Sequence, residues 1–266
     1  MAEKKEMTFL EHLEELRWHL VRSAISIVVL STVAFIFKNI IFDKIILAPK
    51  NPAFITNRLL CEFGEWMDIT ALCINSVPIQ LININLTGQF TTHINISLVA
   101  GLILAFPYVF WEIWRFIKPA LYEKELKHSR GAVIITSLLF LTGILFGYFI
   151  IVPLSTDFLS TYQVSSEVVN QITLKSYIST VTSITLAGGI AFELPVLIYV
   201  LSKVGIVSAA FLKKYRKHAI IVILILAAII TPPDVFSQIL VSIPLYALYE
   251  VGVVISKKIE RKTSKS

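Results

Sequence analysis

The chain has 266 residues, of which 56% are apolar and 16% are charged, and its mean hydropathy is +0.76. Soluble domains average about 45–50% apolar and about 25% charged residues, and one globular core of this size could not bury the excess. The composition argues against a soluble enzyme, excludes a disordered chain or a nucleic-acid-binding module, and indicates a polytopic membrane protein. The net charge of +6 then reflects Lys and Arg held on the cytoplasmic side.

Six windows with almost no charge predict transmembrane helices, because about 20 mainly apolar residues cross a bilayer. In chain order they are 21–41, 94–111, 131–153, 177–201, 218–231 and 236–255. Pro232 and Pro233 separate the last two windows as a tight hairpin. The expected fold class is all-α: a single six-helix transmembrane domain over 1–256, followed by a basic tail over 257–266.

The distribution of basic residues predicts the orientation. With the N-terminus inside, 19 of the 24 Lys and Arg residues lie before the first span or at its mouth (Arg22), in the loops 112–130 and 202–217, or in the tail. The positive-inside rule then places both termini in the cytoplasm. The long external loop, about 43–92, is expected to contain an amphipathic helix near 57–72 and a strand-like stretch at 81–86.

Motifs for catalysis and for cofactor binding are missing from the sequence. It has no HExxH, G-x-S-x-G, Walker or dinucleotide motif. The cysteines form no C-x-x-C. The chain has five histidines, and no two of them have the spacing of metal ligands: His12, His19, His93, His128 and His218. We therefore expect no catalytic residue, no metal and no cofactor. The charged start of the chain also lacks the pattern of a cleavable signal peptide.

The segment 9–20, FLEHLEELRWHL, predicts an amphipathic helix with Glu15 and Arg17 off its apolar stripe. One interpretation is an interfacial helix that leads into the first span. Helices attracted to anionic lipid are basic, however, whereas this one carries three glutamates. The pattern therefore favours contacts with protein.

The segment 106–125 concentrates aromatic residues at the cytoplasmic end of the second span; Pro119 interrupts it and Glu123 and Glu125 follow. The simplest interpretation is an aromatic belt beside solvated acids. The alternative is a ledge that receives an arginine-bearing peptide, because a carboxylate pairs bidentately with guanidinium in a way that lysine cannot match.

Glu193 is predicted to lie inside the fourth span, about 12 Å from its cytoplasmic end. Insertion of an acid at that depth costs on the order of 3 kcal/mol, so the side chain should face protein or water. Pro195 removes a backbone hydrogen bond nearby and predicts a kink. A functional glutamate and a structural one bonded to Ser or Thr remain alternatives. Separately, the spacing of Gly143 and Gly147 predicts close helix packing.

Several motifs together resemble the TatC family, the multi-span subunit of twin-arginine protein translocases. They follow the family's order and spacing and cover the chain from about 8 to 256: FLEHLEELR (9–17), FIKPALYEKE (116–125), FGYFIIVPL (146–154), AFELPV (191–196), TPPDVFSQ (231–238) and IPLYALYE (243–250). The resemblance implies a receptor that binds twin-arginine signal peptides at its cytoplasmic face. With TatA- and TatB-type single-span partners, it would export folded proteins across the bacterial cytoplasmic (inner) membrane using the protonmotive force. Contact with lipid and self-association in the complex are also implied, and nucleic acid is not a partner.

The resemblance also implies roles for individual residues. The residues matched to signal-peptide binding are Glu15, Arg17, Phe116 and Glu125. Glu193 matches an intramembrane glutamate on the concave side of the bundle, and Pro49 matches a proline after the first span. The residues matched to contact with the single-span partner are Thr231, Asp234 and Gln238.

The sequence departs from the family pattern in two places. His19 stands where many relatives carry arginine, which makes a basic role there pH-dependent. The first external loop is longer than usual and contains Cys61 and Cys73, on the side where disulfides persist. A bond between them would stabilise the fold by about 3 kcal/mol; two buried thiols are the alternative.

Two other functions are less well supported by the sequence. A six-helix secondary transporter would use Glu193 as a proton-coupled ligand, but the chain shows no related halves. A membrane enzyme would need a nucleophile or metal constellation, and the sequence offers none.

Overall fold

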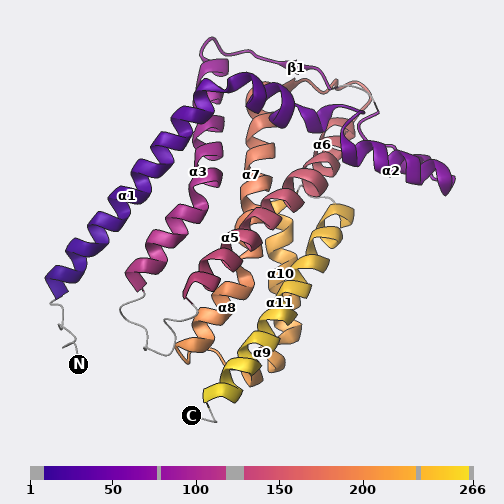
Figure 1. Ribbon diagram of the computed structural model, residues 1–266. Helices are drawn as coiled ribbons and strands as arrows, with labels where there is room; N and C mark the ends of the chain where they lie inside the picture. Colours follow the sequence, from indigo (N-terminus) through magenta and orange to yellow (C-terminus); the bar gives the residue numbers. More distant parts are fainter. Residues whose placement is uncertain (1–8, 77–78, 118–128, 232–234, 264–266) are drawn as a thin grey trace. The chain divides into compact units, whose positions relative to one another are not determined.

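The computed structural model describes residues 9–76, 79–117, 129–231 and 235–263 (Figure 1). These ranges are mostly helical. The α-helices are α1 (Phe9–Ile36), α2 (Ile55–Trp66), α3 (Gly88–Ile117), α5 (Ser129–Phe146), α6 (Val152–Thr161), α7 (Leu174–Phe192), α8 (Leu194–Lys203), α9 (Ala209–Lys214), α10 (Arg216–Ile230) and α11 (Val235–Thr263).

Short irregular elements connect the helices. The π-helical segments are η1 (Ile40–Ile46) and η5 (Gly147–Ile151), and the 3-10 turns are η2 (Ala48–Lys50) and η3 (Thr70–Leu72). Two short strands, β1 (Leu81–Ile82) and β2 (Ile172–Thr173), pair in parallel. The chain divides into two compact units: unit 1 comprises residues 1–38 and 93–138, and unit 2 comprises 39–92 and 139–266.

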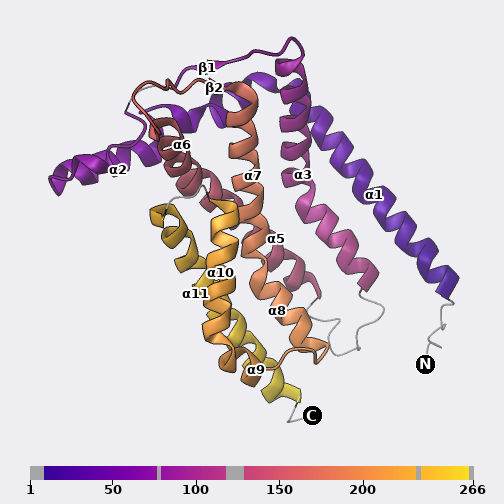
Figure 2. The same cartoon turned by 180° about the vertical axis from the view of Figure 1, so that it is seen from behind.

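In unit 1, α1 and α3 lie side by side (Figures 1 and 2). A glycine permits their close approach, because a Cβ at Gly101 would overlap the backbone of Ser31. Near the other end of α1, the rings of Phe35 and His93 stack with centroids 3.9 Å apart. Both helices keep large apolar side chains exposed, as expected of helices that face lipid.

In unit 2, α11 packs against α8 and α10, and α7 packs against η5. Gly143 faces Gly188 and Gly189 across the α5–α7 contact, where a Cβ at Gly143 would lie 2.9 Å from the Cα of Gly189. Gly147 makes a similar approach to the backbone of Thr185. The predicted close packing through Gly143 and Gly147 is therefore confirmed.

Five helical segments in the described ranges are long and apolar enough to cross a membrane. They are His12–Ile36, Gly88–Phe116, Gly131–Thr161, Leu174–Lys203 and Ser237–Arg261. Each overlaps one predicted window. The remaining window corresponds to α10, whose 15 residues span about 22 Å, less than the hydrocarbon core of about 30 Å. Six crossings and cytoplasmic termini remain predictions.

Several element boundaries differ from the sequence-based ones. The segment at 9–20 does not form a separate helix: α1 continues through it and ends at Ile36 rather than at 41. The external helix is α2, which ends at Trp66, and the strand-like stretch pairs only at Leu81–Ile82. α11 extends to Thr263, into the segment assigned to the tail. Hydropathy windows detect apolar residues, whereas helices continue through polar residues wherever their backbone bonds can form.

We predict that Gly143→Ala destabilises the folded chain by about 1–3 kcal/mol, because the added methyl meets backbone atoms of α7 that cannot move aside. The matched control is Gly131→Ala in the same helix, where a Cβ would have no neighbour within 4 Å. The midpoint of SDS-induced unfolding measures both. Equal midpoints for the two variants would contradict the close α5–α7 packing.

Candidate functional site

Three aromatic rings gather in unit 1 where the first turns of α1 approach the last turn of α3. The rings of His12 and Phe116 stack with centroids 4.4 Å apart and an interplanar angle of 19°. His19 meets the edge of Phe116 at 6.0 Å. His12 and His19 share one face of α1 because they are two helical turns apart. Together they fix the ring of Phe116 between them.

A buried carboxylate supports this aromatic group. Glu112 is 1% exposed and forms an ion pair with the Nδ1 of His19. Its other oxygen, Oε1, accepts a hydrogen bond of 2.9 Å from the hydroxyl of Tyr108. Tyr108, Glu112 and Phe116 recur every four residues and so occupy one face of α3. Since both carboxylate oxygens have partners, the site holds a buried acid without an unsatisfied charge.

The sequence-based interpretation missed Glu112. It ended the second span at residue 111 and so placed Glu112 in a cytoplasmic loop, whereas α3 continues to Ile117. The i, i+4 spacing of Tyr108, Glu112 and Phe116 was the signal that could have identified a common face.

Of the residues matched to signal-peptide binding, Glu15 and Arg17 are exposed on α1, one to two turns from His12. Phe116 is half-buried in the aromatic group. Glu125 and Pro119 lie outside the described residues. Of these residues, the described ranges therefore bring Phe116 into contact with α1, through the ring of His12.

Glu193 occupies the break between α7 and α8. It is the C-cap of α7, and Pro195 follows in the first turn of α8, where its missing N–H is tolerated. Both carboxylate oxygens are buried, and neither accepts a hydrogen bond of normal geometry from the described residues. The described ranges thus provide no Ser or Thr hydroxyl for it, as the structural alternative would require.

Polar side chains connect α10 to α11. The amide of Gln238 donates to the carbonyl of Leu224 at 3.1 Å, and Arg216 pairs with Glu250 at 2.6 Å. Thr231 is buried at the end of α10 and donates to the carbonyl of Ala227. Asp234, Pro232 and Pro233, which follow Thr231 in the chain, lie outside the described residues.

A polar network in unit 2 surrounds Pro49. The amide of the buried Asn57 donates to the carbonyls of Pro49 at 3.0 Å and Asn51 at 2.8 Å. Asn75, with a positive φ of 49°, donates from its side chain to Pro153 and from its backbone to Asp157. These bonds fix the segment after the first span to α6.

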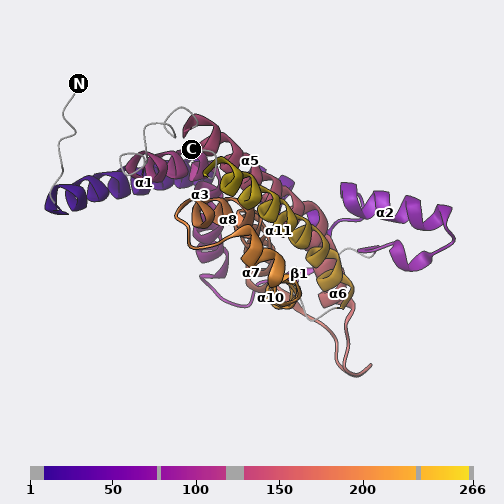
Figure 3. The ribbon, with the colours of Figure 1, turned by 90° about the horizontal axis from the view of Figure 1, so that it is seen from below.

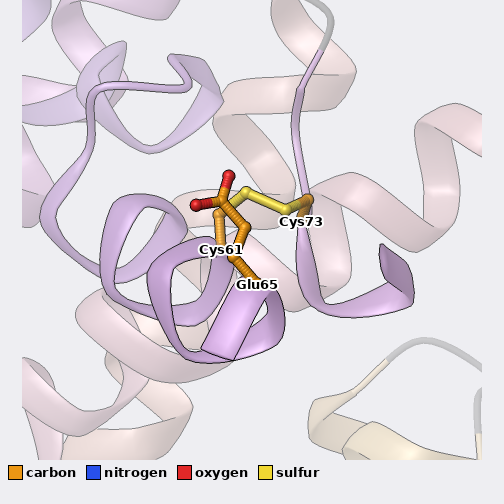
Figure 4. Close-up of side chains that lie close together, drawn as sticks. All are labelled: Cys61, Glu65 and Cys73. Carbon is orange, nitrogen blue, oxygen red and sulfur yellow. A yellow bond between two sulfur atoms is a disulfide. The ribbon is translucent and has the colours of Figure 1, made fainter. Parts of the chain in front are cut away.

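A disulfide joins Cys61 and Cys73. Of the two alternatives that the sequence allowed, a disulfide or two buried thiols, the structure has the disulfide. Figure 4 shows Glu65 beside this bond. The described ranges contain one group of three potential metal ligands whose ligand atoms lie within 4.8 Å of one another: Cys61, Glu65 and Cys73. Because both sulfurs are bonded to each other, this group is not a metal centre.

Comparison with known proteins identifies the family. The model of the family "Sec-independent protein translocase protein (TatC)" matches residues 11–244. The chain belongs to the TatC family. It is 42% identical over 262 residues to the TatC of Blattabacterium sp. subsp. Periplaneta americana, covering 98% of both chains. It is 31% identical over 261 residues to TatCy of Bacillus subtilis, covering 98% of this chain and 93% of that one.

Solved structures agree with this assignment. A crystal structure of the "Twin Arginine Translocase Receptor- TatC" matches with a TM-score of 0.68 and 35% identity over 93% of this chain and 98% of that chain. A second, in DDM, matches with a TM-score of 0.70 and 34% identity over 92% and 99%. The chain is thus a multi-pass membrane subunit of a protein translocase and not an enzyme, and a small-solute transporter is disfavoured.

We predict strong energetic coupling between His19 and Glu112. Glu112→Leu leaves the imidazole without its partner and should destabilise the fold by several kcal/mol, whereas the added His19→Leu recovers part of that loss. A double-mutant cycle on SDS unfolding should give a coupling of about 1–3 kcal/mol. Glu15→Leu, at an exposed position on α1, is the control and should change stability by less than about 0.5 kcal/mol. A coupling near zero would contradict the pair.

We also predict that Glu193→Leu stabilises the fold by about 1–3 kcal/mol, because it removes a buried carboxylate that lacks a hydrogen-bond donor. If the residue serves transport, the same variant should lose export of twin-arginine substrates. A Glu193→Leu variant that is more stable but no longer exports substrates would identify Glu193 as a functional glutamate. Loss of both would instead show that Glu193 supports the fold, and Glu193→Gln tests whether the charge itself matters.

Proposed function

We propose that this TatC-family subunit binds twin-arginine signal peptides at the cytoplasmic ends of α1 and α3. The observation that carries the proposal is the stacking of Phe116 on His12, one helical turn from the exposed Glu15. A guanidinium pairs bidentately with a carboxylate and also stacks on aromatic rings. An acid beside a fixed aromatic ring therefore suits arginine, and lysine lacks both features.

The remaining signal-peptide contacts follow the family resemblance. Glu125, in the segment after Phe116, would supply a second carboxylate for the second arginine. Arg17 would contact acidic or carbonyl groups of the peptide. The solved relatives named as twin-arginine translocase receptors support this assignment.

We further propose that the subunit works with TatA- and TatB-type single-span partners, and with further copies of itself, to export folded proteins with the protonmotive force. The α10–α11 hairpin, with Thr231, Asp234 and Gln238, would contact a single-span partner. α10 is short and its exposed face is strongly apolar, which suits a second helix packed against it in the membrane. The membrane would be the bacterial cytoplasmic membrane.

The receptor function predicts that Glu15→Ala and Glu125→Ala weaken binding of a twin-arginine signal peptide about tenfold or more, because each removes a charge-assisted pair. Glu14→Ala, at the neighbouring exposed glutamate, is the matched control and should leave binding unchanged. Fluorescence anisotropy of a labelled peptide with purified full-length protein measures the affinities. A Lys-Lys peptide should bind weakly to wild type. Equal affinity for both peptides, in wild type and variants alike, would contradict the proposal.

A further inference from the structure

α2 has three faces of different chemistry. One face contacts the chain on both sides of α2: Asn57 bonds to Asn51 before the helix, while Cys61, through the disulfide, and Gly64, through close packing, contact the chain that follows it. A second face carries charged side chains; Arg58 and Glu62 pair at 3.5 Å while more than 60% exposed, and Glu65 lies beside them. The third face is a stripe of four apolar side chains. They are exposed by 50% to 80%: Ile55, Leu59, Phe63 and Trp66.

The helix is held so that it cannot turn this stripe inward. Asn57 bonds the first turn of α2 to the segment after α1, and the disulfide Cys61–Cys73 holds the following turns to the returning chain. The ring of Phe54, just before α2, stacks on Phe149 with centroids 5.5 Å apart. The exposure of the apolar stripe is therefore a fixed feature of unit 2.

The direction of α2 suits a position along the membrane surface. Within unit 2 it runs sideways from α6 and α7 (Figures 1 and 2) and, seen from below, lies to one side of α7, α10 and α11 of the same unit (Figure 3). Thr56 donates to the carbonyl of Phe149 at 2.5 Å, within the candidate span Gly131–Thr161. Phe149 lies 18 residues, or about 27 Å of helix, beyond Gly131, which is close to the hydrocarbon thickness of about 30 Å, and the apolar segment continues from there to Thr161.

The faces of α2 are also ordered correctly for that position. At about 100° per residue, Phe63 lies within about 20° of Thr56 on the helix circumference, and Ile55 within about 100°. Glu65 and Arg58 lie on the opposite side, about 160–180° from Thr56, and Glu62 lies about 120° from Thr56, next to Ile55. The apolar stripe thus lies between the side that bonds to the span and the charged face, and Arg58 and Glu65 point away from the span.

We propose that α2 is an interfacial helix whose apolar stripe, Ile55, Leu59, Phe63 and Trp66, inserts into the lipid headgroup region and anchors this loop to the bilayer. Two apolar side chains of η1, in the same unit and shortly before α2 in the chain, are also exposed: Ile40 by 47% and Ile45 by 42%. Tryptophan favours this interface. Because the charged face has a net negative charge, apolar contact and not attraction to anionic lipid holds the helix.

The test uses a single reporter on the full-length chain. Both natural cysteines are in the disulfide, so an introduced cysteine is the one free thiol in the oxidised protein. Leu59→Cys and Phe63→Cys place an NBD fluorophore on the stripe, and Arg58→Cys places it on the charged face as the matched control. Each protein is reconstituted in phosphatidylcholine vesicles with and without brominated lipid, which quenches fluorophores that touch it.

We expect the two stripe probes to emit at shorter wavelength than the probe on the charged face. Brominated lipid should also quench them several times more strongly than it quenches that probe. Adding anionic phosphatidylglycerol should leave the quenching unchanged. Equal quenching on both faces, or absence of quenching on the stripe, would overturn the proposal. A shift to shorter wavelength without quenching by lipid would also overturn it, because it would show that a second copy of the chain covers the stripe.

Discussion

A polar group between apolar helices needs a partner in the protein, because hydrocarbon offers neither donor nor acceptor. This constraint organises both units. In unit 1 the carboxylate of Glu112 is held by His19 and Tyr108, and that arrangement fixes the ring of Phe116. In unit 2, Gln238 donates to α10, and the buried amides of Asn57 and Asn75 satisfy backbone carbonyls.

Among the buried side chains of the described residues that lack a hydrogen-bond partner, Glu193 is the one carboxylate. Its carboxylate is buried at a helix break without a hydrogen bond of normal geometry to the described residues. A chain under selection for stability alone would replace it with an apolar residue, since an unsatisfied buried acid is unfavourable.

Hydropathy located the spans because about 20 apolar residues in sequence are a strong and local signal. The residues that decide the site depend on contacts that no local pattern shows. His19 and Glu112 lie on different helices far apart in the sequence, and Glu112 stands just past the apolar window. Likewise, the alternation at 81–86 predicted a longer strand, but the partner β2 offers only Ile172–Thr173. The acids after Pro119 indicated a ledge for an arginine-bearing peptide, and the family resemblance then selected Glu125 among them.

The proposed receptor function places the twin arginines at the α1–α3 end of unit 1. Photo-crosslinking can test this placement, with benzoylphenylalanine in place of His12 beside Phe116, and in place of Trp66 on α2 as a control. A twin-arginine signal peptide should crosslink at position 12 but not at 66, and its Lys-Lys counterpart should crosslink at neither. Equal yields for the two peptides at position 12, or capture at 66 alone, would show that this end of unit 1 does not receive the twin arginines.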